Sequence, residues 1–135
     1  MNVILLDTNA YSQYAGGNET VAEYILGADI VYLSTVVIGE LYAGFLSGSK
    51  YEKNVSELYS ILSRNYYRTI DVTLNTVAIY GTIWSELKRK GQIIPTNDIW
   101  IAAHTIETNA LLITYDTHFL QVANLHVWND LAKTG

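Results

Sequence analysis

Four acidic residues stand where an α/β fold would bring carboxylates together: Asp7, Glu40, Asp98 and Asp116. Each lies just past a predicted strand or near the start of a predicted helix. In a parallel α/β fold, strands end and the following helices begin at the same edge of the sheet, and ligands bind in the crevice outside that edge. Carboxylates that meet there repel one another unless a counter-charge is present. Their placement therefore implies a divalent metal ion.

Such a cluster would suit phosphodiester hydrolysis. Magnesium and manganese are hard ions that prefer oxygen ligands. A bound ion of this kind can activate water, neutralise a phosphodiester oxygen and stabilise the leaving oxygen. This chemistry requires neither cysteine nor histidine. The chain has no cysteine and no H-E-x-x-H motif, so thiolate and zinc-protease sites are not indicated.

Each acid also has a purely structural interpretation. Asp7 and Asp98 are placed to complement a helix dipole at an N-terminus, and Asp116 is placed to start a turn. Glu40 is less easily explained, because it shares a helical stripe with Val36 and Val37 and would border the core. An acid at the border of an apolar stripe is costly unless it reaches solvent, a partner or an ion. The joint placement of the four acids is thus a stronger signal than any one of them.

Polar neighbours of the acids have two possible roles. They either orient the carboxylates by hydrogen bonds or cap helices. The residues concerned are Thr8, Asn9, Asn97 and Thr114. The three histidines show no metal-ligand spacing, and His118 is the one placed to contact substrate because it follows Asp116. Lys88-Arg89-Lys90 is the densest basic run, and its position in the last turn of a helix favours a dipole role over nucleic-acid binding.

The order of predicted elements indicates an α/β fold. Apolar runs predict strands over 3–6, 30–33, 69–72 and 110–114, with a short fifth edge strand over 125–128. Helical spacing and capping signals predict the intervening helices, for which the approximate ranges are 8–15, 20–26, 35–46, 51–64, 75–90 and 96–108. Alternation of strands and helices favours a three-layer α/β/α sandwich with a mainly parallel sheet of four to five strands. The whole chain, 1–135, is expected to form a single domain.

Composition limits the possible functions. The net charge is −5, which argues against binding nucleic acid through a broad basic surface but not against a nuclease with a concentrated acidic site. Half of the residues are apolar and 16% are charged, so a folded chain is expected. The sequence predicts no membrane span and no signal peptide, which is compatible with the cytoplasm.

The ordered set of motifs resembles the PIN-domain ribonucleases, and within them the VapC-type toxins of toxin–antitoxin pairs. The matching stretches lie across nearly the whole chain: Leu5-Leu6-Asp7-Thr8-Asn9, Ile38-Gly39-Glu40-Leu41 with Gly44, Asn97-Asp98-Ile99-Trp100-Ile101-Ala102-Ala103, and Thr114-Tyr115-Asp116 with Phe119. The resemblance implies a PIN-like fold in which Asp7, Glu40, Asp98 and Asp116 hold Mg²⁺ or Mn²⁺. It also implies cleavage of RNA, with tRNA or rRNA as possible targets, by a homodimer that is blocked by a cognate VapB-type antitoxin.

Two other functions remain open from the sequence. One is a PIN-like module that binds protein or RNA without catalysis, which the eleven tyrosines and the lack of net basicity would suit. The other is phosphotransfer through Asp7 as a nucleophile, because Asp7-Thr8-Asn9 partly resembles an Asp-x-Asp loop whose second acid is replaced. Metal binding distinguishes the first alternative from a nuclease, and trapping of an aspartyl-phosphate would be needed for the second.

Overall fold

The computed structural model describes residues 1–128 and 130. Its elements follow one another in the order β1 (Val3–Leu6), α1 (Thr8–Ala15), α2 (Glu19–Leu26), β2 (Ile30–Ser34), α3 (Thr35–Ser47), α4 (Tyr51–Leu62), β3 (Tyr67–Ile70), α5 (Leu74–Arg89), α6 (Thr96–Glu107), β4 (Leu111–Ile113) and the 3₁₀ helix η1 (Thr117–Gln121). None of the helices in this described part has the length and apolar character needed to cross a bilayer.

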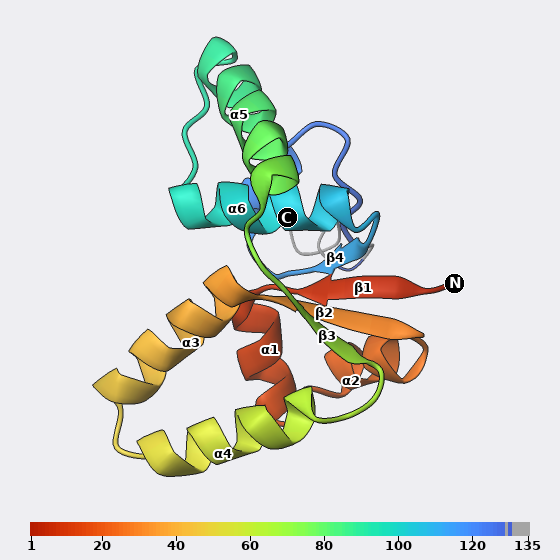
Figure 1. The fold of residues 1–135 in the computed structure, drawn as a ribbon, viewed down its shortest axis with the longest axis vertical. Helices are drawn as coiled ribbons and strands as arrows, with labels where there is room; N and C mark the ends of the chain where they lie inside the picture. The colour runs from red at the N-terminus through yellow and green to blue at the C-terminus, as the bar shows by residue number, and fades with distance from the viewer. Residues whose placement is uncertain (129, 131–135) are drawn as a thin grey trace.

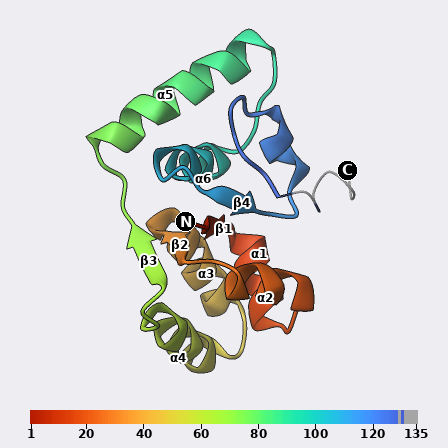
Figure 2. The same ribbon diagram turned by 90° about the vertical axis from the view of Figure 1, so that its right-hand side faces the viewer.

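The strands form a parallel sheet in the order β3-β2-β1-β4. Figures 1 and 2 show α1 to α4 on one side of this sheet and α5 and α6 on the other. The predicted three-layer α/β/α arrangement is therefore confirmed. Strands buried on both faces explain the near-continuous apolar runs. Leu5, Leu6 and Leu33, for example, are fully buried at the centre of the sheet.

The strand order places a topological switch point between β1 and β4. From β1 the chain builds the sheet outward through β2 to β3, and it then crosses back to add β4 on the other side of β1. Neighbouring loops diverge at such a point and leave a crevice beyond the carboxyl ends of the strands. The carboxyl ends of β1 and β4 are therefore brought together, although more than 100 positions of sequence separate them. The Asp7 N–H, for example, donates a hydrogen bond to the Ile113 carbonyl (3.2 Å).

Three local expectations need correction. The third strand covers Tyr67–Ile70 rather than 69–72. The buried Tyr67 anchors this edge strand, and its exposed centre gives little apolar signal in the sequence. The predicted strand over 125–128 is reduced to a single bridge between Leu112 and Val127. Helix α1 is capped by Asp7 rather than by Thr8 or Asn9.

Candidate active site

A cavity of about 440 Å³ opens at the carboxyl edge of the sheet, beside the switch point. Its walls come from the ends of β1 and β4, the N-terminal turns of α1 and α6, and one turn of α3. The lining residues are Asp7, Thr8, Asn9, Glu40, Asp98, Ile101, Tyr115, Asp116 and Thr117. All four acids predicted from the sequence therefore face one cavity.

Asp7 lies at the base of this cavity and is only 4% exposed. Its Oδ1 accepts a hydrogen bond from the Ala10 N–H (2.8 Å) at the start of α1. Its Oδ2 accepts one from the Thr114 hydroxyl, just past β4. Both oxygens are thus fixed in position by the two elements that flank the switch point.

Burial raises the pKa of Asp7 to about 6, and the nearby charges of Asp116 and Asp98 add to the increase. The two hydrogen bonds act in the opposite direction but do not cancel the effect of burial. A carboxylate with this pKa gains considerably from a bound cation. Asp7 therefore both caps α1 and contributes a carboxylate to the cavity.

Glu40 projects from α3 toward the same cavity, with its carboxylate held at both oxygens. The Thr8 hydroxyl donates to Oε1 (2.6 Å), and the Asn97 amide donates to Oε2 (3.4 Å). These two donors come from α1 and α6, so three helices meet at this carboxylate. The structure thus assigns Thr8 and Asn97 an orienting contact, where the sequence left orientation and helix capping equally open.

We expect Thr8→Val to weaken Mg²⁺ binding by about 10- to 100-fold, the usual effect of removing a group that orients a metal ligand. The change preserves shape but removes the hydroxyl that donates to Glu40. Isothermal titration with MgCl₂ measures the effect. Thr8→Ser retains the hydroxyl and serves as the matched control, so equal losses in both variants would contradict the role assigned to Thr8.

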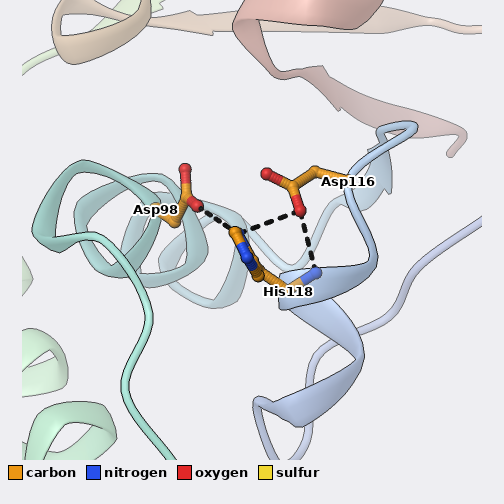
Figure 3. Close-up of side chains that lie close together, drawn as sticks. All are labelled: Asp98, Asp116 and His118. Carbon is orange, nitrogen blue, oxygen red and sulfur yellow. Dashed lines mark hydrogen bonds and ion pairs between the residues drawn. The ribbon is translucent and has the colours of Figure 1, made fainter.

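Asp98 and Asp116 approach each other across the mouth of the cavity, with His118 between them (Figure 3). The His118 Nδ1 lies 3.4 Å from Asp98 Oδ2 and 3.1 Å from Asp116 Oδ1. One ligand atom from each residue falls within 4.8 Å of the others, a spacing that could accommodate a metal ion. Partial burial, followed by the charge of Asp116, raises the pKa of Asp98.

Among the described residues, this trio is the group of potential ligands that meets this spacing, and Asp7 and Glu40 are not part of it. They line the same cavity. Asp116 also caps η1, because its Oδ1 accepts from the His118 N–H (2.9 Å). His118 was predicted only as a substrate contact, and its position between two acids is closer to the site than the sequence indicated.

The structure also separates residues that line the cavity from those that support it. Asn9 lines the wall. Thr114 is fully buried behind it, where its hydroxyl donates to Asp7 and accepts from the Asp116 N–H (2.9 Å). Sequence reasoning did not single out the roles of Ile101, Tyr115 and Thr117, whose side-chain types carry no metal-binding signal.

His104, the buried histidine among the described residues, has a structural role. His104 is fully buried in α6, with Nδ1 2.8 Å from the Ser34 hydroxyl and Nε2 3.0 Å from the Asp71 carbonyl. Burial lowers the pKa of His104, so the neutral imidazole is favoured. It connects α6 to the ends of β2 and β3 and does not line the acidic cavity.

The geometry around Asp7 does not favour phosphotransfer. A nucleophilic carboxylate needs an oxygen that is free to attack. Both oxygens of Asp7 accept hydrogen bonds, and the residue is almost completely buried. The arrangement instead suits a fixed acid that orients an ion or water.

Comparisons with known proteins show the family of this chain. The sequence model of the PIN domain matches residues 4–125. The chain is 33% identical over 132 residues to ribonuclease VapC2 of Rickettsia felis, covering 94% of this chain and 97% of the relative. It is 28% identical to ribonuclease VapC1 of Haemophilus influenzae strain R2866, covering 97% and 99% of the two chains.

Solved structures show the same relationship. The crystal structure of VapBC2 from Rickettsia felis, bound to a DNA fragment from their promoter, superposes with a TM-score of 0.80 at 30% identity and covers 93% of this chain and 97% of that chain. The structure of FitAcB from Neisseria gonorrhoeae gives a TM-score of 0.74 at 29% identity, with 93% and 96% covered. The chain therefore belongs to the PIN-domain family and, within it, to the VapC-type proteins.

Proposed function

We propose that this protein is a metal-dependent endoribonuclease and the toxin of a type II toxin–antitoxin pair. The observation that carries the proposal is the convergence of Asp7, Glu40, Asp98 and Asp116 on one cavity at the switch point of the sheet. The ribonuclease names of the relatives support the choice of RNA as the substrate.

The donor set fits a hard divalent cation, either Mg²⁺ or Mn²⁺. Its acids supply the carboxylates that these ions prefer, and the His118 imidazole lies beside two of them. The raised pKa values of Asp7 and Asp98 reflect burial next to other acids, a situation that a cation relieves. Asp98 and Asp116 would hold the ion most directly, with Asp7 and Glu40 completing the acidic wall. When bound, the ion would supply water activation and neutralisation of the phosphodiester charge.

The chain's own contribution is to hold these groups in place. Thr114 and the Ala10 N–H fix the carboxylate of Asp7. Thr8 and Asn97 fix that of Glu40. Because the oxygens are oriented before substrate arrives, little reorganisation is needed during the reaction. His118 lies at the exposed side of the cavity, where its imidazole can contact a phosphate or a base of the RNA.

The biological setting is also part of the proposal. The complexes among the structural relatives support a VapB-type antitoxin as the partner. We propose that the chain acts in the cytoplasm as one domain and as a homodimer. A single network of buried apolar residues that reaches every layer of the fold supports the single domain.

Cleavage of RNA by the purified, antitoxin-free protein tests the proposal. Total tRNA and rRNA are incubated with MgCl₂, with MnCl₂ or with EDTA, and the new RNA ends are sequenced. We expect defined cuts with either ion and none with EDTA. A retained fold with neither metal binding nor cleavage would instead favour the binding module without catalysis.

A further inference from the structure

Trp128 lies outside the acidic cavity but contacts Thr114, the residue that supports Asp7 and Asp116. Trp128 is 1% exposed and lies beyond residues 4–125, the part of the chain that matches the PIN-domain sequence model. Its indole Nε1–H donates a hydrogen bond of 2.5 Å to the backbone carbonyl of Thr114. The side-chain hydroxyl of that same threonine hydrogen-bonds to the Asp7 carboxylate and to the backbone N–H of Asp116.

Thr114 connects Trp128 to two of the four acids. Its hydroxyl donates to Asp7 Oδ2 and accepts the hydrogen bond from the Asp116 N–H. A rotation of the Thr114 backbone would therefore move the donor to Asp7 and the segment that carries Asp116 together. Holding the Thr114 carbonyl fixes both contacts at once.

Strand β4 is too short to provide this support itself. It ends at Ile113, so Thr114 to Asp116 lie outside the sheet ladder. Trp128 holds the end of β4 at two points, because its backbone N–H donates to the Leu112 carbonyl (3.0 Å) while its indole bonds to Thr114. In place of the predicted fifth strand, the structure thus has a single bridge at Val127 and, next to it, the Trp128 side chain that anchors the end of β4.

Aromatic neighbours fix the orientation of the indole. The rings of Tyr24 and Tyr115 pack edge-on against Trp128, with centroids 5.2 Å and 5.1 Å away. The Tyr115 hydroxyl in turn accepts from the Asn18 amide (2.9 Å), and Asn18 also caps α2. We call these four residues, Asn18, Tyr24, Tyr115 and Trp128, the Trp128 clamp. It joins α2 to the segment that carries Thr114 and Asp116.

We propose that Trp128 is a positioning residue for the acidic site and acts through Thr114 on Asp7 and Asp116. This inference rests on the proposed metal-dependent function. The indole is not in the cavity wall, so its effect is on the geometry of the ligands rather than on contact with RNA. It extends the set of functional residues past residues 4–125, which the PIN-domain sequence model matches.

Trp128→Phe tests the proposal, because phenylalanine retains an aromatic ring but lacks the N–H donor. We expect Mg²⁺ affinity, measured by calorimetry, and kcat at saturating Mg²⁺ to fall by about 10- to 100-fold, the range for supporting partners of metal ligands. KM for RNA should remain unchanged, since an interaction that orients the reacting groups affects kcat rather than uniform binding.

Leu58→Ala provides the matched control. Leu58 is buried in α4, which packs against the edge strand β3, and its truncation lowers stability by leaving a cavity. This control should lower Tm without changing Mg²⁺ affinity or kcat. If Trp128→Phe lowers Tm but, like the control, leaves Mg²⁺ affinity and kcat at wild-type values, the positioning role is wrong.

A spectroscopic measurement on the wild type needs no destabilised variant. The indole N–H resonance of Trp128 should shift when MgCl₂ is titrated into the ¹⁵N-labelled protein, whereas that of Trp84 on α5 should not. Trp84→Phe and Trp100→Phe assign the signals. A wild type that neither binds Mg²⁺ nor cleaves RNA would refute the proposed function. Binding and cleavage with an unmoved Trp128 resonance would refute only the positioning role.

Discussion

Asp7→Asn is expected to lower the rate of RNA cleavage by about 10³-fold or more while the protein remains folded. Asp7 is the most buried acid of the cavity, and both of its oxygens are fixed. The amide has the same shape and still accepts from the Ala10 N–H, but it carries no charge. A 10³-fold lower rate corresponds to the loss of about 4 kcal/mol of transition-state stabilisation, since about 1.4 kcal/mol equals a tenfold change in rate. Cleavage of a fluorescent RNA under saturating Mg²⁺ measures it.

Asp29→Asn is the matched control for this experiment. Asp29 is an exposed acid before β2, at the amino edge of the sheet and therefore at the end opposite the cavity. It loses the same charge, and we expect wild-type cleavage. Near-normal cleavage by a folded Asp7→Asn variant would mean that the cavity described above is not the active site.

Asp7→Asn should also stabilise the metal-free protein at neutral pH. Asp7 has its pKa raised from 3.8 to about 6 in the folded state. A group with a raised folded pKa contributes stability that is fully present below its unfolded pKa and is lost as pH rises through its folded pKa. The difference between the two pKa values of Asp7 corresponds to about 3 kcal/mol of unfolding free energy. The wild type loses this stability between about pH 4 and pH 7. Asp98, whose pKa is also raised, acts with the same sign.

Urea denaturation of wild type and Asp7→Asn in EDTA across this pH range measures the effect. The variant should become the more stable protein as pH rises, because the buried charge is absent. Saturating MgCl₂ should offset most of the lower stability of the wild type, because it stabilises the wild type by about 2.7 kcal/mol when the free ion exceeds its Kd 100-fold. A difference between the two proteins that does not vary with pH would contradict the burial of an ionisable group at position 7.

Much of the fold could be predicted because short-range chemistry determines it. Apolar runs marked β1, β2 and β4, and the breaks near Gly16, Gly27 and Gly91 marked the helix ends. The edge strand β3 was misplaced, because its exposed Arg68 and Thr69 give it little apolar signal. The 3₁₀ helix η1 was missed, since a single short turn after a capping acid has no periodicity that a sequence pattern can reveal.

The candidate site was predictable as a set of residue types but not as a geometry. Acids just past strands or at helix starts converge in any parallel α/β fold, so the sequence could place all four at one edge. It could not show that His118 lies between Asp98 and Asp116, or that Thr8 bonds Glu40 across 32 positions. Such contacts depend on the angles at which helices pack, which residue spacing does not encode.

By itself, the sequence determined the parallel α/β architecture and the identity of the acids, because both follow from local periodicity and from where strands end. Only the tertiary structure decided that Asp7 is buried with a raised pKa and that Trp128 supports the site through Thr114. The physical reason is that burial and hydrogen bonding between distant residues arise only when the layers pack together. In the sequence, a tryptophan that only fills the core looks the same as one whose indole hydrogen-bonds to the backbone beside the acidic cavity.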